Sequence, residues 1–221
     1  MNTPIKTSRL LGFAFLFQFV TSFTSGVFLR PLWFIDDDMA QSLRNIAENP
    51  SLLRTCILLD MLTALGVIFL GSLLFVTLHK KNEKLAMTAL GFYILEGVLL
   101  ASSRMATFSL LSLSQEFAIG QSAEVLRLAT LAFDSMEFVG GTLHMVAFVA
   151  GAIPFYALLD QSWLVPRPIS LWGLITVLPF ALGSPLMVLG IDLPFVLYVP
   201  YIPFELGIGL WILVKGIEEK V

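Results

Sequence analysis

The sequence has few charged residues, one cysteine and two histidines. Charged residues make up 13% of the 221 residues, about half the share of about 25% found in soluble globular domains. The formal net charge of −3 offers no basic surface to a nucleic acid, and so apolar a chain is not a disordered one. Because Cys56 is the single cysteine of the sequence, a disulfide framework and a multi-cysteine zinc site are also excluded.

The chain is correspondingly rich in apolar residues. They form 57% of the chain, and the mean hydropathy is +0.87. A helix that crosses a hydrocarbon core of about 30 Å needs about 20 mostly apolar residues. The stretches that meet this requirement are residues 10–29, 53–78, 85–113, 133–159, 169–191 and 195–214. We therefore predict an all-α polytopic transmembrane bundle of six spans in a lipid bilayer, with residues 1–221 forming a single integral membrane domain.

Lysine and arginine residues flank these spans unevenly. If the N-terminus lies in the cytoplasm, eight of them fall on the cytoplasmic side and four on the outer side, as the positive-inside rule requires. The eight are Lys6, Arg9, Lys80, Lys81, Lys84, Arg167, Lys215 and Lys220, and the four are Arg30, Arg44, Arg54 and Arg127. We therefore predict that both termini are cytoplasmic.

Two outer connections have helical spacing. Residues 39–49 place Met39, Leu43 and Ile46 on one side of a helix, which is typical of a short amphipathic helix. We expect this helix to lie on the extracytoplasmic membrane surface between spans one and two. Residues 124–133 also have helical spacing, and they can extend the fourth span outward.

Three ionisable residues fall at nearly one depth inside the predicted bilayer. At about 1.5 Å per residue, Glu96 lies about 18 Å from the cytoplasmic end of its span, His144 about 22 Å and Glu205 about 15 Å. A charge at a helix centre costs about 2.5–3.5 kcal/mol, so such residues usually face the bundle interior and have partners. We predict that the three converge on a polar pocket that binds a small ligand, a proton or another cation.

A second polar layer lies nearer the outside. Asp60 and Arg104 lie about 27 Å and about 30 Å in, so an ion pair between spans two and three would neutralise both. On the fourth span, Asp134, Glu137 and His144 fall within about 80° of one helix face at about 100° per residue. This stripe predicts a polar path from the outer surface to the pocket.

Several chemistries fit the three central residues. Two carboxylates and one imidazole can bind a metal, but zinc sites of this kind usually use more imidazole, and His79 lies on the cytoplasmic side. Proton or cation handling is a second interpretation, and a site for the head of a lipid, quinone or other amphiphile is a third. The cluster can also be purely structural.

The functional alternatives are therefore a ligand-binding transporter or receptor, a membrane-embedded enzyme acting on an amphiphile, and a structural or assembly protein. The sequence assigns no catalytic residue, metal, cofactor or oligomeric state.

The chain resembles a bacterial multi-pass membrane protein family catalogued as domain of unknown function 4386, from Arg9 to Gly216. The motifs that carry the resemblance are Arg9-Leu10-Leu11-Gly12, Asn45-Ile46, Leu53-Arg54, Asp60, Glu96, His144, Pro203-Phe204-Glu205-Leu206, Leu210-Trp211 and Lys215-Gly216. The resemblance implies a multi-helix membrane fold and no established activity, and we expect the protein to lie in a bacterial inner membrane. It also implies that Arg54, Asp60, Glu96, His144 and Glu205 are the residues to test, and it supplies no catalytic role.

Overall fold

A computed structural model describes residues 5–191 and 193–217, and the regular elements in these two stretches are helices. In order they are α1 (Ile5–Phe23), η1 (Thr24–Leu29), η2 (Arg30–Leu32), α2 (Met39–Glu48), α3 (Pro50–Leu78), α4 (Glu83–Gly120), α5 (Ala123–Glu137), η3 (Phe138–Leu143), α6 (His144–Ser162), α7 (Arg167–Val188), η4 (Phe195–Leu197) and α8 (Tyr201–Lys215). Lys220, one of the predicted cytoplasmic cations, lies outside the described residues.

The prediction of six long apolar helices is confirmed. The stretches long and apolar enough to cross a membrane are Arg9–Leu32, Pro50–Leu78, Glu83–Gly120, Ala123–Ser162, Arg167–Val188 and Phe195–Lys215. The fourth joins α5, η3 and α6 into one continuous element, so residues 124–133 do extend that span. The third is also longer than predicted, because helical residues continue beyond the apolar run.

Side-chain caps set where several helices begin. The Asp38 carboxylate accepts a hydrogen bond from the Gln41 amide at 2.8 Å and starts α2. In the same way, Asn82 caps α4 by accepting from the Leu85 amide at 3.1 Å. These side chains satisfy amide groups that have no partner within the first turn of a helix.

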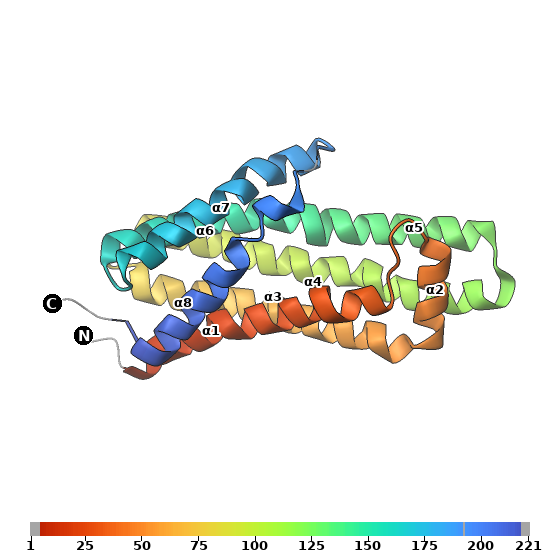
Figure 1. The fold of residues 1–221 in the computed structure, drawn as a ribbon, viewed down its shortest axis with the longest axis horizontal. Helices are drawn as coiled ribbons and strands as arrows, with labels where there is room; N and C mark the ends of the chain where they lie inside the picture. Colours follow the sequence, from red (N-terminus) through yellow and green to blue (C-terminus); the bar gives the residue numbers. More distant parts are fainter. Residues whose placement is uncertain (1–4, 192, 218–221) are drawn as a thin grey trace.

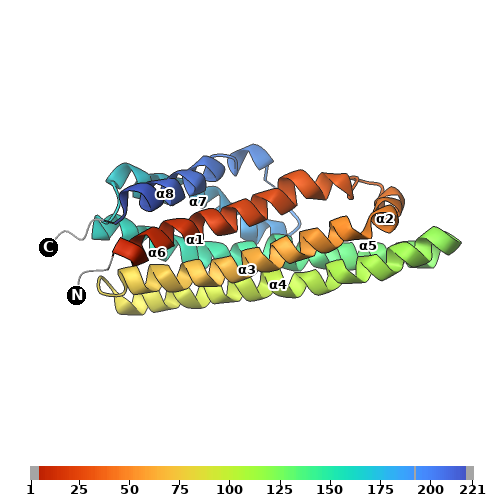
Figure 2. The ribbon, with the colours of Figure 1, turned by 90° about the horizontal axis from the view of Figure 1, so that it is seen from below.

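The helices form a bundle with unequal ends. The helix α3, the helix α4 and the joined α5–α6 run along the bundle, whereas α7 and α8 cover only the end where α1 begins and α8 ends (Figures 1 and 2). The neighbours of α1 are α3 and α8, and α7 packs on α6. The 38 residues of α4 extend about 57 Å, which is longer than a hydrocarbon core of about 30 Å is thick.

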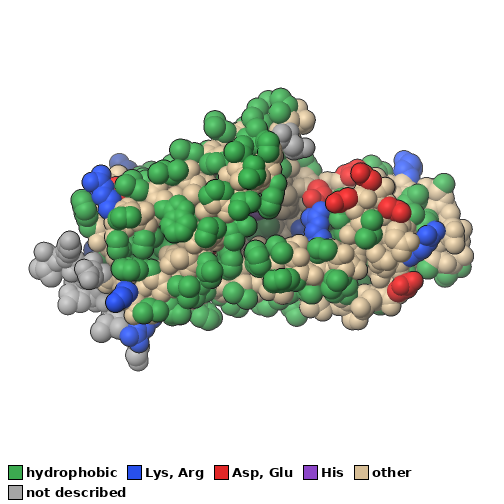
Figure 3. Space-filling view, viewed as in Figure 1, with side chains coloured by type: hydrophobic (Ala, Val, Ile, Leu, Met, Phe, Trp, Pro, Cys, Tyr) green, Lys and Arg blue, Asp and Glu red, His purple; other side chains and the backbone are tan. Residues whose placement is uncertain are grey.

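Two hydrophobic cores lie along the bundle. The six-helix core joins α1, α3, α4, α6, α7 and α8 and contains the fully buried Phe15, Leu74 and Phe155. The four-helix core joins α2, α3, α4 and α5 and contains the fully buried Leu43 and Ile46. In Figure 3, hydrophobic side chains cover the six-helix end, while acidic side chains gather over the other end.

The helix predicted between spans one and two is present as α2, but its apolar face packs on protein and not on lipid as expected. Leu43 and Ile46, from the face expected to meet lipid, are both 0% exposed within the four-helix core. The cause is the unexpected length of α4 and α5, whose projecting ends supply a protein surface that α2 covers.

Candidate functional site

Two wide helical turns shape the space between the two cores. The segments η1 in the first long helix and η3 in the fourth are π-helical. A π-turn closes its hydrogen bonds over five residues instead of four, and such turns occur frequently at functional sites. Ser25 and Gly26 of η1 and Gly140 of η3 all line the same cavity, so both wide turns border it.

This central cavity has a volume of about 550 Å³. Of the residues predicted to form a pocket or an ion pair, five line it: Asp60, Glu96, Arg104, His144 and Glu205. The Glu96 carboxyl lies within electrostatic range of the Glu205 carboxyl, and the His144 ring lies within electrostatic range of the Arg104 guanidinium. Figure 3 shows a hollow on this face with histidine and basic side chains inside it. Four long helices, α3, α4, α6 and α8, therefore bring acids, a base and an imidazole to one space.

Three buried polar atoms on residues that line this cavity have no hydrogen-bond partner within the described residues: Trp33 Nε1, Glu96 Oε2 and His144 Nδ1. The last two belong to ionisable side chains, which are 6% and 9% exposed. A buried polar atom without a partner costs about 1–3 kcal/mol, and more if it is charged. The two atoms are therefore available to a group that enters the cavity.

The third central residue, Glu205, has a neutral partner. Its carboxyl accepts a hydrogen bond from the Gln18 side-chain amide, which reaches it from α1. An amide orients a carboxyl without neutralising it. Neither Glu205 nor Glu96 has a basic hydrogen-bond partner among the described residues. A carboxyl in a water-poor space either holds a proton or pairs with a cation.

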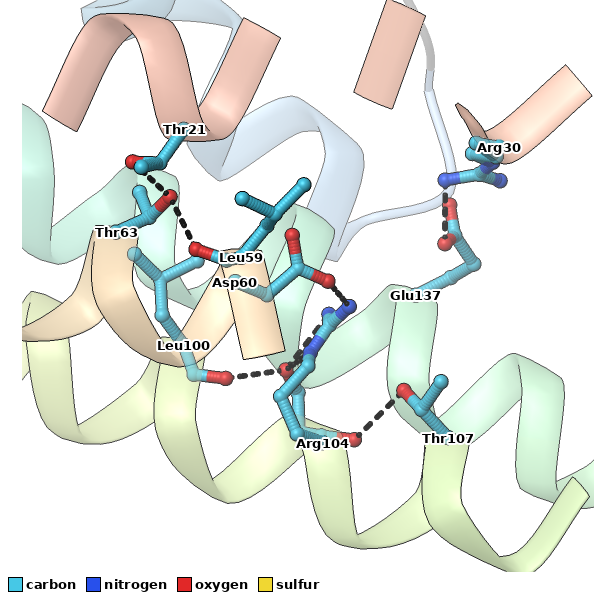
Figure 4. A network of polar contacts seen from close by, with 10 residues as sticks. Thr21, Arg30, Leu59, Asp60, Thr63, Leu100, Arg104, Thr107 and Glu137 are labelled. Carbon is cyan, nitrogen blue, oxygen red and sulfur yellow. Dashed lines mark hydrogen bonds and ion pairs between the residues drawn. The ribbon is translucent and has the colours of Figure 1, made fainter. Parts of the chain in front are cut away.

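An ion pair joins α3 to α4 at the cavity. The Arg104 guanidinium donates to the Asp60 carboxylate at 2.5 Å and to the Ser103 hydroxyl at 2.9 and 3.0 Å (Figure 4). Gly140 leaves room for this pair, since a Cβ atom at that position would lie 2.7 Å from Arg104 Nη2. The Asp60 carboxylate thus already neutralises the positive charge of Arg104.

A second ion pair links the two wide turns. Arg30 follows η1 directly, Glu137 precedes η3 directly, and their side chains meet at 2.9 Å (Figure 4). Both are partly exposed, at 36% and 40%. Because Arg30 also lines the cavity, this pair lies at its outer margin.

The predicted stripe on the fourth span is interrupted. Asp134 is exposed and is not among the residues that line the cavity, although His144 does line it. The angle of about 100° per residue holds for an α-helix, whereas η3 contains more residues per turn and turns α6 relative to α5. Arg54 is exposed too and lies away from the cavity lining.

An aromatic group lies beside the acids. The rings of Phe148, Phe180 and Tyr201 pack edge to face, with centroids 5.3–5.7 Å apart, and all three line the cavity. The Tyr201 hydroxyl shares a buried hydrogen bond of 2.6 Å with the Tyr156 hydroxyl. The cavity therefore combines carboxyls, an imidazole and aromatic rings.

Metal binding finds less support in the side-chain arrangement. Across residues 5–191 and 193–217, the side chains contain no group of three or more His, Cys, Asp and Glu that is placed to hold a metal ion. Glu96, His144 and Glu205 share a cavity without forming such a cluster.

Sequence reasoning missed Gln18, Arg30 and the aromatic group. Gln18 is visible as a lone amide within the first apolar run, and its polarity alone marks it as a residue facing the bundle. In the sequence, Arg30 is visible only as a charge that flanks the first span. The aromatic group leaves no signal, because phenylalanine is common throughout the chain.

The chain belongs to the family described as "Domain of unknown function (DUF4386)", which matches residues 10–216. The match covers nearly all of the chain and confirms the resemblance noted from the sequence motifs. No curated protein and no solved structure matches the chain.

Proposed function

We propose that this member of the DUF4386 family is a multi-pass membrane protein whose central cavity binds a small cationic ligand. Glu96, Glu205 and His144 would hold the cation, and Glu137 with Arg30 would border the outer opening. The observation that carries the proposal is that Glu96 Oε2 and His144 Nδ1 are buried, lack hydrogen-bond partners among the described residues and line one cavity. Asp134 and Arg54, both exposed, have no part in this site.

The charges around the cavity favour a cation over an anion. Both arginines in the lining already have acidic partners, Arg104 at 2.5 Å and Arg30 at 2.9 Å. The two deeper carboxyls have no basic partner within the described part of the chain, so any charge that they carry when they lose their protons is negative and unbalanced. A positively charged ligand would balance it, whereas an anion would add to it.

We further propose that both termini lie in the cytoplasm and that the protein, as a single domain, occupies a bacterial inner membrane. The end where α1 begins carries Lys80, Lys81, Lys84, Arg167 and Lys215 in its flanks, which agrees with the positive-inside rule. Labelling of cysteines introduced at Lys81 and at Asp37 with a membrane-impermeant reagent tests this orientation. Only the Asp37→Cys variant should react from outside intact spheroplasts.

The binding proposal is tested with butylammonium, a small soluble cation. The full chain in lipid nanodiscs should be stabilised saturably against heat as butylammonium is added, because a ligand that binds only the folded state raises the melting temperature. Glu96→Gln should abolish this response while leaving the unliganded protein at least as stable. Glu116→Gln is the matched control, since Glu116 is an exposed acid on the same helix.

Two results would contradict the proposal. The first is a butylammonium response that Glu96→Gln leaves unchanged. The second is the absence of any response in the natural sequence together with a lower stability of Glu96→Gln, which would identify the cluster as purely structural. An enzyme would instead convert an added amphiphile, and no catalytic geometry among the described residues of this cavity favours that alternative.

A further inference from the structure

A second pocket adjoins the central cavity. This side pocket has a volume of about 290 Å³ and is built from η3, α6, α7, η4 and α8. The residues that line both spaces are Met145, Phe180, Phe195, Tyr201 and Ile202. Because they share these walls, the two spaces are neighbours, and a ligand with two parts can occupy both.

The side pocket is apolar, in contrast to the central cavity. Its remaining lining residues are Gly141, Ser184, Met187 and Tyr198, so none of the described residues that line it carries a charge. The shared Tyr201 already uses its hydroxyl in the bond to Tyr156. Methionine side chains are flexible and adapt well to apolar ligands. The pocket is therefore suited to a hydrocarbon chain, and its volume lies at the lower limit for small-molecule sites.

The polar groups lie next to the shared wall. Met145 directly follows His144 on α6, and Tyr201 lies four residues before Glu205 on α8. Residues four apart on a helix are surface neighbours. A polar group held by His144 and Glu205 would thus have the side pocket beside it, available to the apolar remainder of the same molecule.

The chemistry of the central cavity favours a primary ammonium as that polar group. The aromatic group of Phe148, Phe180 and Tyr201 offers ring surfaces that attract a cation. Glu96 Oε2 lacks a hydrogen-bond donor among the described residues, and a primary ammonium supplies N–H donors as well as charge. A quaternary ammonium has no N–H group and would leave this oxygen unsatisfied.

We propose that the ligand is a single-chain amphiphile with a primary amine head. The head lies between Glu96, Glu205 and His144, and the aliphatic chain enters the side pocket. This inference rests on the proposed cation site and adds the identity of the ligand class to it.

The test compares butylammonium with dodecylammonium on the full chain in phosphatidylcholine nanodiscs, using thermal stabilisation at a series of concentrations. Ser184→Leu partly fills the side pocket, so it should weaken the binding of dodecylammonium by about tenfold, the equivalent of about two methylene contacts. The binding of butylammonium should be unchanged. Leu182→Phe is the control, since Leu182 is 68% exposed on the same helix. Each amine partitions equally into the lipid around every variant, so differences between variants report the site.

A second variant guards against a folding defect in Ser184→Leu. Met187→Ala enlarges the side pocket and should shift the preferred chain length upward, from dodecylammonium towards tetradecylammonium. Dodecyltrimethylammonium should bind the natural sequence more weakly than dodecylammonium does.

The outcomes separate the two proposals. If both side-pocket variants keep the natural chain-length preference while Glu96→Gln still weakens butylammonium, the placement of the chain is wrong and the cation site stands. If the quaternary amine binds as tightly as the primary one, the head group is wrong. If Glu96→Gln changes the binding of neither amine, the proposed cation site is wrong, and the inference that rests on it is wrong as well.

Discussion

The six-helix core and the four-helix core both contain large buried side chains, but close helix contacts at glycines distinguish the six-helix core. In the six-helix core, glycines allow helices to approach closely: a Cβ atom on Gly12 would lie 2.8 Å from the Gly209 carbonyl oxygen of α8. At the other end, a Cβ atom on Gly120 would have no described atom within 4 Å, and large side chains such as Leu43 and Ile46 fill the interior.

We expect this difference to follow from the surroundings, with lipid around the six-helix core and water around the four-helix core. In lipid there is little hydrophobic drive for helices to associate, so close packing of small residues takes its place. In water, burial of leucine and isoleucine side chains stabilises the fold by itself. The projecting end is therefore assembled like a small soluble bundle, and the other end like a membrane bundle.

The largest expected effect comes from matched leucine substitutions, one in each core. Leu43→Ala should cost about 2–5 kcal/mol of unfolding free energy, as in soluble cores. Leu74→Ala, at an equally buried position of the six-helix core, should cost about 1–2 kcal/mol less, because an unfolded helix in lipid still holds its leucine in an apolar medium. Unfolding in mixed micelles titrated with sodium dodecyl sulfate measures both. Equal losses would show that the two cores do not differ in surroundings.

An intermediate effect is expected at the ion pair between the cores. Asp60→Asn leaves Arg104 without its carboxylate and should cost about 2–3 kcal/mol, below the range of about 3–5 kcal/mol for fully buried pairs, since these side chains are 20% and 16% exposed. Asp160→Asn is the control: its contact with Arg167 is 3.7 Å long and the arginine is 57% exposed, so the loss should be below about 1 kcal/mol. The same unfolding titration applies, and similar losses at both sites would refute the ranking.

The smallest effect is expected from glycine substitutions. Gly12→Ala should destabilise the protein by about 1–3 kcal/mol, because the added methyl group meets the backbone of α8. At Gly91 on α4, an added Cβ atom would have no described atom within 4 Å, so Gly91→Ala should be neutral or stabilising by up to about 1 kcal/mol through helix propensity. Melting temperatures in nanodiscs distinguish them. A neutral Gly12→Ala would mean that α1 and α8 are not held by close packing.

The positions of the long helices could be predicted because each depends on one local property, the length of an apolar run. That Glu96, His144 and Glu205 line one cavity could be predicted for a similar reason, since rise per residue converts position in the sequence into position along a helix. The rotation of a helix is harder to predict. The prediction that Asp134 shares the face of His144 assumes a regular helix, and no pattern in residues 138–143 indicates a wide turn.

The contacts of α2 could not be predicted because they depend on distant parts of the chain. An amphipathic pattern shows that one face seeks an apolar partner, but it does not distinguish lipid from protein. That partner exists only because α4 and α5 continue past the apolar runs, a property of residues far from α2 in sequence. Gln18 and the aromatic group were missed for the same reason, since their significance comes from neighbours on other helices.

The wide turn η3 also affects how the chain tolerates changes in length. It sits immediately before His144 and holds one residue more than an ordinary turn would need. Loss of a single residue there would leave a regular helix, preserve the span and keep the imidazole in place, because one residue fewer at about 100° each turns the chain through nearly the same angle as the wide turn. Loss of a residue from the regular part of α5 would instead rotate the two sides of the deletion by about 100° relative to each other. The chain should therefore tolerate a deletion in η3 better than one in the adjoining helix.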